Sequence, residues 1–246
     1  VVPARGLNHF LPYLPGSPAA SACWTGEKSE VTILYTNDVH TYIDKQAPEL
    51  TYAAIAALKQ SYQNAGKKVL LVDAGDHVQG TAYGSMDEGA SIIELMNAAG
   101  YDVATPGNHE FDYGMDQFLH IAKDLAKYPY ISANFTGKDG KPYFDAYKMF
   151  EVKGVKVAFV GVCTPETFTK STPTYFQDAN GNYIYGFCEG NNGADLYKAV
   201  QKAIDAAKAA GADYVIGLGH LGQQGEFLLQ IFLVLAVDAR EVRRLA

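Results

Sequence analysis

Apolar residues along the chain fall into short runs typical of buried strands and into longer stretches with helical spacing. The strand-like runs cover residues 31–37, 69–73, 101–105, 130–134 and 214–218. The stretches with helical spacing cover residues 50–65, 90–99, 115–127 and 193–210. Gly66 and Gly100 follow two of these stretches, as expected where a helix ends. Strands that alternate with helices predict an α/β protein built around a layered sheet.

Two segments depart from this alternation. Residues 147–152 and 156–162 are both strand-like and flank a short stretch with Gly154, so they predict a β-hairpin. Residues 164–192 are rich in Thr, Asn, Gly and Tyr, and they are too many for a plain connection. We therefore expect this long loop to form a wall of a binding site.

The chain divides into three parts by composition. We expect a flexible leader at residues 1–29, a globular domain at 30–222 and an atypical apolar tail at 223–246. The leader lacks the basic region and apolar core of an intact signal peptide. The apolar run in the tail has roughly half of the about 20 residues that cross a bilayer, so no membrane span is expected. A buried helix or a wrong-frame segment would each explain the tail, and we favour the second.

Composition and charge mainly exclude certain classes of protein and partner. The 246 residues are 48% hydrophobic and 19% charged, which is ordinary for one large globular domain. The net charge of −7 and the lack of a basic stripe argue against a nucleic-acid polymer as partner. A small anionic substrate is compatible with this charge if metal ions supply positive charge locally. Cys23, Cys163 and Cys188 show no zinc-finger spacing, and Cys163 is expected to be an inert core thiol.

Polar residues of a metal-binding type follow four of the strand-like runs. In chain order they are Asp38 and His40, Asp76, Asn108 and His109, and His220. Open α/β sheets bind ligands at the carboxyl ends of their strands, where such residues would meet. Asp, Asn and His without Cys form a ligand set for a hard or borderline divalent cation. Each motif alone has an ordinary explanation, but their joint occurrence at strand ends predicts a metal centre.

The candidate ligands suit two ions. Asp38 and His40 are two residues apart, so on an extended chain their side chains would share one face. The carboxylate of Asp76 could bridge two ions, and Asn108 offers a neutral oxygen. Two ions about 3.5–4 Å apart would hold a phosphate, acidify a bridging water and stabilise an in-line displacement. The expected metal ligands are Asp38, His40, Asp76, Asn108 and His220.

His109 adjoins Asn108 but must point elsewhere, so it is free for another role. Asp112 follows at i+3, one helical turn away. A carboxylate that fixes the tautomer of a histidine and favours its protonated form makes that histidine a general acid. We therefore expect His109 and Asp112 to be a catalytic pair and Asp73 to cap a turn or support the ligands. Three further histidines are expected to be structural or solvated: His9, His77 and His120.

Several of these motifs resemble the metallophosphatase domain of the 5′-nucleotidase family, within the calcineurin-like metallophosphoesterases. The matching stretches are VTILYTNDVH (31–40), LLVDAGDHVQG (70–80), YDVATPGNHEFDYG (101–114), YISANF (130–135), FVGVCTPET (159–167) and GLGHLG (217–222). The GNHEFD core of the third stretch is highly specific. The resemblance implies a four-layer α/β/β/α sandwich, a dinuclear site with the five ligands named above, and His109 with Asp112 as its catalytic pair.

The resemblance also implies a function. Such enzymes hydrolyse nucleoside phosphates, cyclic nucleotides or nucleotide sugars, with a metal-activated water as nucleophile and His109 as general acid here. The ions would be Zn, Mn, Fe or Co. Proteins of this family are commonly exported, which implies an extracytoplasmic location.

The chain departs from the family pattern in several places. Tyr35 replaces a usual His, Thr41 a usual Gly, and Pro106 a usual aliphatic residue. No histidine follows His220, whereas the family has a further Gly-His-x-His or Gly-His-x-Gln motif. The resemblance also implies a second domain that binds the nucleoside base, and we expect this chain to lack it. We expect a domain that is incomplete at its C-terminus, through a frameshift or truncation near Gly222.

Two alternatives to a phosphoesterase remain open at this point. The first is a non-catalytic remnant that binds metal or phosphate with an incomplete ligand set. The second is a sulfur-ester hydrolase of related fold, because ligands alone do not identify a substrate.

Overall fold

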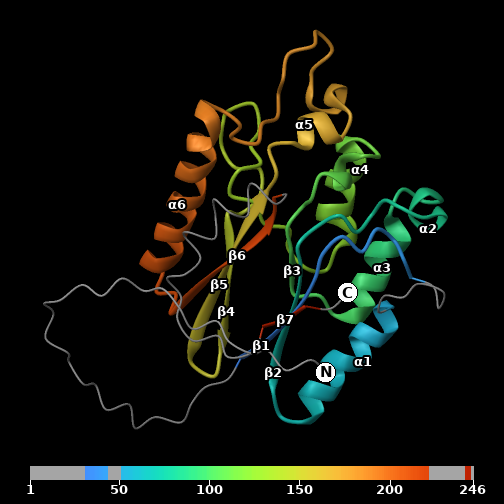
Figure 1. Ribbon diagram of the computed structural model, residues 1–246, viewed down its shortest axis with the longest axis vertical. Helices are drawn as coiled ribbons and strands as arrows, with labels where there is room; N and C mark the ends of the chain where they lie inside the picture. Colours follow the sequence, from blue (N-terminus) through green and yellow to red (C-terminus); the bar gives the residue numbers. More distant parts are fainter. Residues whose placement is uncertain (1–30, 44–50, 222–241, 245–246) are drawn as a thin grey trace, which may run out of the picture.

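The computed structural model describes residues 31–43, 51–221 and 242–244, which form two sheets with helices on either side (Figure 1). The first sheet has the strand order β3-β2-β1-β7, and all its pairs are parallel. The second has the order β4-β5-β6, with β4 antiparallel and β6 parallel to β5. The strands are β1 (Val31–Thr36), β2 (Lys68–Asp73), β3 (Val103–Ala104), β4 (Tyr147–Val152), β5 (Val155–Cys163), β6 (Tyr214–His220) and β7 (Val242–Arg244).

Helices cover the outer faces of both sheets. Those of the described residues are α1 (Tyr52–Asn64), α2 (Ala82–Ser85), α3 (Ala90–Ala99), α4 (Met115–His120), α5 (Thr167–Lys170) and α6 (Ala194–Ala209). A π-helix (Ile121–Leu125) continues α4. Short 3-10 helices occupy His109–Phe111, Pro173–Phe176 and Asn191–Gly193.

The period of two along each strand sends alternate side chains into different layers. Leu71 of β2 packs with the helices, whereas Leu70 and Val72 face the second sheet. On β5, Phe159 packs between the sheets and Val160 packs with α6. Both faces of these strands are buried, which explains their continuous apolar sequence. With α1, α3 and α4 on one side and α6 on the other, the expected α/β/β/α order is confirmed (Figure 1).

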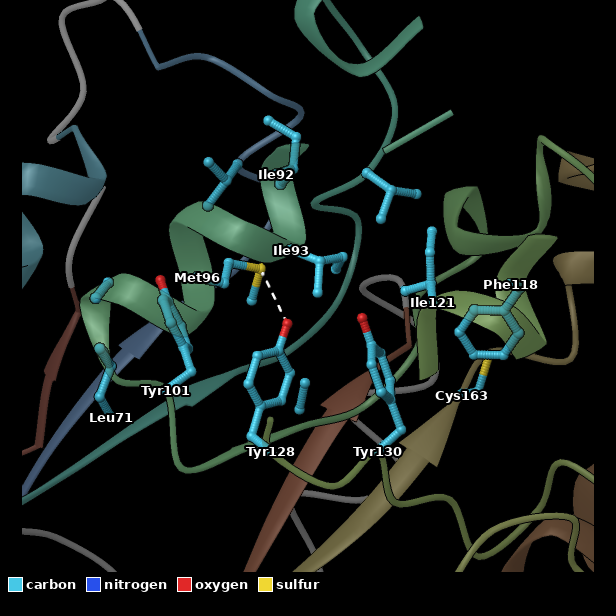
Figure 2. Close-up of a cluster of buried hydrophobic side chains, with 14 of the residues drawn as sticks. Leu71, Ile92, Ile93, Met96, Tyr101, Phe118, Ile121, Tyr128, Tyr130 and Cys163 are labelled. Atoms are coloured by element: carbon cyan, nitrogen blue, oxygen red, sulfur yellow. Dashed lines mark hydrogen bonds between the residues drawn. The ribbon is translucent and has the colours of Figure 1, made fainter. Parts of the chain in front are cut away.

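Figure 2 shows the core between the first sheet and its helices. Met96 of α3 and Phe118 of α4 are fully buried, and Tyr128 and Tyr130 stand between them. The hydroxyl of Tyr128 donates to the sulfur of Met96 at 3.4 Å. Burial of each such side chain contributes about 1.5–3 kcal/mol. This layer holds α3 and α4 firmly over the strands whose ends carry the polar clusters.

Two helix ends and the hairpin lie where the sequence predicted them. The side chain of Thr51 accepts a hydrogen bond from Ala54 N at the start of α1. Gly100 caps α3 with a φ of 78°, in the left-handed region that the sequence led us to expect. The antiparallel pairing of β4 with β5 confirms the hairpin.

The strand expected at residues 130–134 is wrong. Ile131 N donates to Ala104 O of the first sheet at 2.9 Å, and Ala133 N donates to Gly161 O of the second at 2.8 Å. The segment therefore crosses from one sheet to the other and forms only an isolated bridge, between Ala104 and Tyr130. The strand expected at 101–105 is also shorter, covering only β3.

The helix expected at 115–127 ends at Leu125 and changes to π geometry after His120. Asn97 of α3 sets this end, because its side chain donates to Leu125 O and accepts from Lys127 N. A neighbouring helix thus terminates this one, a contact that local spacing does not reveal.

Cys163 lies in the core, and its burial raises the pKa of its thiol well above the usual range, as expected for an inert core thiol. His9, Cys23, the leader and most of the tail lie outside the described residues. Within the described residues, every helix is too short or too polar to cross a membrane.

Candidate metal centre

The loops that follow β1, β2 and β3 meet at one edge of the first sheet. Asp38 N donates to Gly75 O at 3.1 Å and His40 N donates to Asp76 O at 2.9 Å, which fastens the first loop to the second. A Cβ on Gly75 would overlap the backbone of Gly107, and a Cβ on Gly107 would overlap the carboxylate of Asp76. The second and third loops can therefore pack this closely only because both positions lack side chains.

A cleft of about 320 Å³ lies at this edge. Its lining residues are Asn37, Asp38, His40, Asp76, Asn108, His109, Thr164, Lys170, His220 and Leu221. The structure thus brings together all the residues that sequence analysis proposed as ligands, and His109 with them. Asp112 is not a lining residue and contacts the ring of His109.

Asp76 lies at the centre of the cluster and is almost fully buried. Its Oδ2 is 3.1 Å from His220 Nε2 and 3.7 Å from His40 Nε2. Its Oδ1 accepts a hydrogen bond from His109 N at 2.8 Å. The side chains form two groups whose donor atoms lie within 4.8 Å of one another: His40, Asp76 and His109, and Asp38, Asp76 and His220. Asp76 belongs to both groups, which is the position of a carboxylate that bridges two ions.

The rings of His40 and His220 are oriented by backbone carbonyls. Nδ1 of His40 donates to Gln79 O and Nδ1 of His220 donates to Ala74 O, each at 3.0 Å. A carbonyl can only accept, so in the neutral ring the lone pair is on Nε2, which faces Asp76 in both cases. Metal-binding histidines are commonly held in this way. The donor set therefore fits a divalent cation such as Zn, Mn, Fe or Co.

The backbone that carries these ligands is left-handed at several non-glycine residues. The φ angles are 54° at Asp38, 47° at His40, 60° at Thr41 and 59° at Asp76. The extended chain that we expected at residues 38–40 is therefore wrong. The side chains meet nonetheless, with His40 Nε2 3.6 Å from Asp38 Oδ1. Each such residue costs on the order of 1 kcal/mol, and strain of this kind concentrates at functional sites.

Carboxylates and imidazoles stabilise each other's charges in the cleft. The nearby carboxylate of Asp38 raises the pKa of His40, although partial burial opposes this. Burial opposes protonation of His220, but the hydrogen bond and charge of Asp76 raise its pKa to about 9. Burial likewise opposes ionisation of Asp76, but His220 and His109 N lower its pKa. Because a cation needs the same lone pairs, protons and metal ions compete for this site.

His109 and Asp112 form a hydrogen-bonded pair, with 2.6 Å between Nδ1 and Oδ2. The 3-10 helix His109–Phe111 produces the i+3 contact that the spacing predicted. The other oxygen of Asp112 accepts a hydrogen bond from Ser171 Oγ at 3.1 Å. The bond with Asp112 raises the pKa of His109, although partial burial opposes it. The ring is partly exposed in the cleft, so the arrangement suits an acid that can reach a bound substrate.

Glu110 joins the loop after β2 to the loop after β3 by hydrogen bonds, a role that sequence analysis missed. Its side chain is buried, and it accepts hydrogen bonds from Asp76 N at 2.8 Å, His77 N at 2.8 Å and Gly107 N at 2.5 Å. It therefore fixes the backbone on both sides of the Asp76 carboxylate. Glu110 belongs to the GNHEFD motif, but nothing in that motif predicted these hydrogen bonds.

Asp73 and His77 form a buried pair behind the cleft. Asp73 accepts hydrogen bonds from Gly75 N at 2.8 Å and Thr36 Oγ1 at 2.6 Å, so it caps the turn as expected. His77 contacts Asp73 through Nδ1 at 2.7 Å and the Tyr130 hydroxyl through Nε2 at 2.6 Å. Burial opposes its protonation, but the charges of Glu110 and Asp73 raise its pKa to about 9. His77 is thus structural, as expected, and His120 is an exposed partner of Asp124.

Four further lining residues were also missed: Asn37, Thr164, Lys170 and Leu221. The expectation that residues 164–192 would form a wall of the site is confirmed at two of them, Thr164 and Lys170. The only feature of the sequence that pointed to these two residues was the length of that loop, and the length does not identify particular side chains.

Comparisons with known proteins agree with this geometry. Residues 31–233 match the family described as calcineurin-like phosphoesterase. The chain is 31% identical over 244 residues to a 5′-nucleotidase of Mus musculus, covering 93% of this chain and 39% of that protein.

Two solved structures are similar in both sequence and fold. The 5′-nucleotidase precursor from Thermus thermophilus is 27% identical with a TM-score of 0.65, covering 80% of this chain and 38% of that one. The calcineurin-like phosphoesterase YfkN from Bacillus subtilis is 28% identical with a TM-score of 0.63, covering 76% of this chain and 61% of that one. The chain thus spans well under half the length of the 5′-nucleotidases that it resembles.

Proposed function

Because the chain belongs to the calcineurin-like phosphoesterase family, we propose that it is a metal-dependent hydrolase of phosphate esters with nucleotides as substrates. The observation that carries the proposal is the convergence of His40 Nε2 and His220 Nε2 on the Asp76 carboxylate, with both rings oriented by backbone carbonyls. The choice of nucleotides rests on the 5′-nucleotidases among its relatives.

The family implies divalent metal ions, and we propose that this chain holds two of them. The residues that would hold them are Asp38, His40, Asp76, Asn108 and His220. When bound, such ions polarise a phosphoryl oxygen and lower the pKa of a water molecule enough to make it a nucleophile at neutral pH. Asp76, which both ligand groups share, would bridge them.

The chain's own residues would then complete the reaction. His109 carries the proton, its ring partly exposed in the cleft, and gives it to the oxygen that leaves the phosphate. Asp112 holds Nδ1–H and so keeps the ring in one orientation throughout. Ser171 in turn holds Asp112. General acid catalysis of this kind contributes about 10²- to 10⁴-fold in rate.

We also propose that the protein acts outside the cytoplasm, as members of the 5′-nucleotidase family commonly do. The support for this location is the family resemblance alone.

The test of the metal site is the replacement Asp76→Ala. We expect the parent chain to bind about two Mn²⁺ ions, measured by calorimetry and by metal analysis after gel filtration. We expect Asp76→Ala to lose this binding because both ligand groups contain Asp76. Asp124→Ala, which removes an exposed carboxylate paired with His120, is the matched control. Unchanged metal content in Asp76→Ala would refute the assignment.

The test of the reaction is release of phosphate from AMP and from 4-nitrophenyl phosphate, with and without Mn²⁺. We expect hydrolysis to require the metal and to disappear in Asp76→Ala. Hydrolysis that persists after chelation of the metal would exclude the proposed mechanism.

A further inference from the structure

The cleft contains one group that no metal ion can use. Among the lining residues in the described part of the chain, Lys170 alone carries a permanent positive charge. An ammonium group has three donors and no acceptor, so it cannot ligate a cation. The carboxylates of Asp38 and Asp76 face the candidate metal positions. What remains for Lys170 in this cleft is contact with an anion.

Lys170 lies at the end of a firmly anchored helix. In α5, Thr167 is fully buried and its Oγ1 donates to Thr164 O at 2.6 Å. The ring of Phe168 packs edge-on against two buried phenylalanine rings. Directly after the helix, Ser171 donates to Asp112. The Ser171 hydrogen bond ties the end of this helix to Asp112, the partner of the proposed general acid.

The ammonium is paired with a partner that an incoming anion can replace. Lys170 Nζ lies 2.9 Å from Glu166 Oε2, and both side chains are about half exposed. Exposed ion pairs between residues four apart on a helix contribute little, because water and salt screen them. A phosphate dianion carries more charge than a carboxylate and offers several acceptor oxygens. It would therefore compete well for this ammonium.

We propose that Lys170 contacts the phosphoryl group of the substrate and the phosphate product. The inference rests on the proposed function, since the phosphate must first be drawn into the cleft by metal ions. Lys170 then contributes a charge-assisted hydrogen bond from the wall formed by α5. It is a specificity residue, because it favours a doubly charged monoester over a substrate with less charge.

The experiment measures binding of inorganic phosphate to the Mn²⁺-loaded chain by calorimetry, so it needs no turnover. We expect Lys170→Gln to weaken phosphate binding about tenfold, the loss of one charge-assisted hydrogen bond. Mn²⁺ binding and the unfolding temperature should stay unchanged. Glu166→Gln should bind phosphate as tightly as the parent or more tightly, because the competing carboxylate is gone.

Lys198→Gln is the matched control. Lys198 is an exposed lysine on α6, it pairs with Asp195 at 3.2 Å, and it does not line the cleft. Its loss changes the net charge by the same amount, so it reports any general effect of charge on phosphate binding. We expect phosphate affinity within about twofold of the parent.

The possible outcomes separate this inference from the function on which it rests. A Lys170→Gln variant that binds phosphate within about twofold of the parent overturns the inference and leaves the metal site intact. A parent chain that binds Mn²⁺ but not phosphate likewise overturns the inference and leaves the metal site intact. A parent chain that binds no Mn²⁺ overturns the proposed function, and the inference with it.

Discussion

The partner of Nδ1 distinguishes the three imidazoles of the cleft. In His40 and His220 the partner is a backbone carbonyl, which leaves a lone pair on Nε2 in the neutral ring. In His109 it is the carboxylate of Asp112, which favours the protonated ring. A ring whose Nδ1–H is held by a carbonyl, with Nε2 toward Asp76, suits a ligand, and a ring held by a carboxylate suits an acid. His109 is also close enough to Asp76 to act as a ligand, so its role needs a direct test.

The replacement His109→Ala distinguishes acid from ligand. We expect Mn²⁺ content to be unchanged and AMP hydrolysis to fall about 10²- to 10⁴-fold. Hydrolysis of 4-nitrophenyl phosphate should fall much less, because its leaving group needs little help from a proton donor. His120→Ala removes an exposed histidine and is the control. Loss of metal would make His109 a ligand, and equal activity would remove it from the mechanism.

Glu110 should matter for stability more than any exposed carboxylate. Its oxygens accept three backbone N–H groups, and Glu110→Gln would turn one oxygen into a donor that faces a donor. We expect the free energy of unfolding to fall by about 3 kcal/mol. Urea unfolding measures this value, and Glu94→Gln on the exposed side of α3 should change it by less than about 0.5 kcal/mol. An equal effect of the two replacements would contradict this role for Glu110.

At the scale of elements, the site depends on the close packing of two loops. The loop after β2 and the loop after β3 approach so closely that Gly75 and Gly107 leave no room for a Cβ. Glu110 then joins the same two loops by hydrogen bonds. The position of the Asp76 carboxylate is therefore a property of both loops together.

Gly107→Ala tests this packing. The new Cβ would overlap Asp76 Oδ1 and displace it, so we expect Mn²⁺ affinity to fall at least about tenfold. The free energy of unfolding should fall by about 1–3 kcal/mol. Gly137→Ala is the control, because its Cβ would meet Tyr143 at an ordinary contact distance of 3.6 Å. Normal Mn²⁺ binding by Gly107→Ala would show that the two loops can move apart without any loss of Mn²⁺ affinity.

At the scale of the whole molecule, the packing of the four layers brings the candidate ligands together in one cleft. The candidate ligands come from the ends of β1, β2, β3 and β6, so both sheets contribute to the cleft. With Asp76 shared, the five proposed ligands would give each of two ions three protein ligands. A structural zinc site usually has four protein ligands, and a catalytic one three protein ligands with a water molecule. The site is therefore near the lower limit for stable binding of two ions.

We expect this chain to bind Mn²⁺ or Zn²⁺ but to hydrolyse AMP slowly. The reason is the small number of proposed ligands for each ion among the described residues. Under saturating Mn²⁺ we expect a kcat below about 0.1 s⁻¹, against a median of about 10 s⁻¹ for enzymes. Steady-state phosphate release, with Asp76→Ala as background, measures it. A kcat near the median would show that the described ligands are sufficient.

The sequence by itself predicted a layered α/β sheet and the candidate ligands that the structure brings to one cleft. Apolar runs such as residues 69–73 marked the strands, and the residue after each run marked the edge where ligands meet. Asp76 and Asn108 could be assigned to one place because parallel strands end at the same edge of a sheet. His220 ends β6 of the second sheet, so its meeting with Asp76 depends on how the two sheets pack. The i+3 spacing of His109 and Asp112 likewise predicted their hydrogen bond, since local spacing controls local contacts.

Only the tertiary structure decided the features that depend on distant partners. Residues 130–134 have the composition of a strand, but they bond to Ala104 on one sheet and Gly161 on the other. Asp38 and His40 meet through left-handed backbone that the neighbouring loop imposes. Glu110 and Lys170 have no distinctive spacing, and their roles come from the loops and the helix packed around them. Periodicity records which face of an element is buried, but the packing of one loop on another determines where its side chains point.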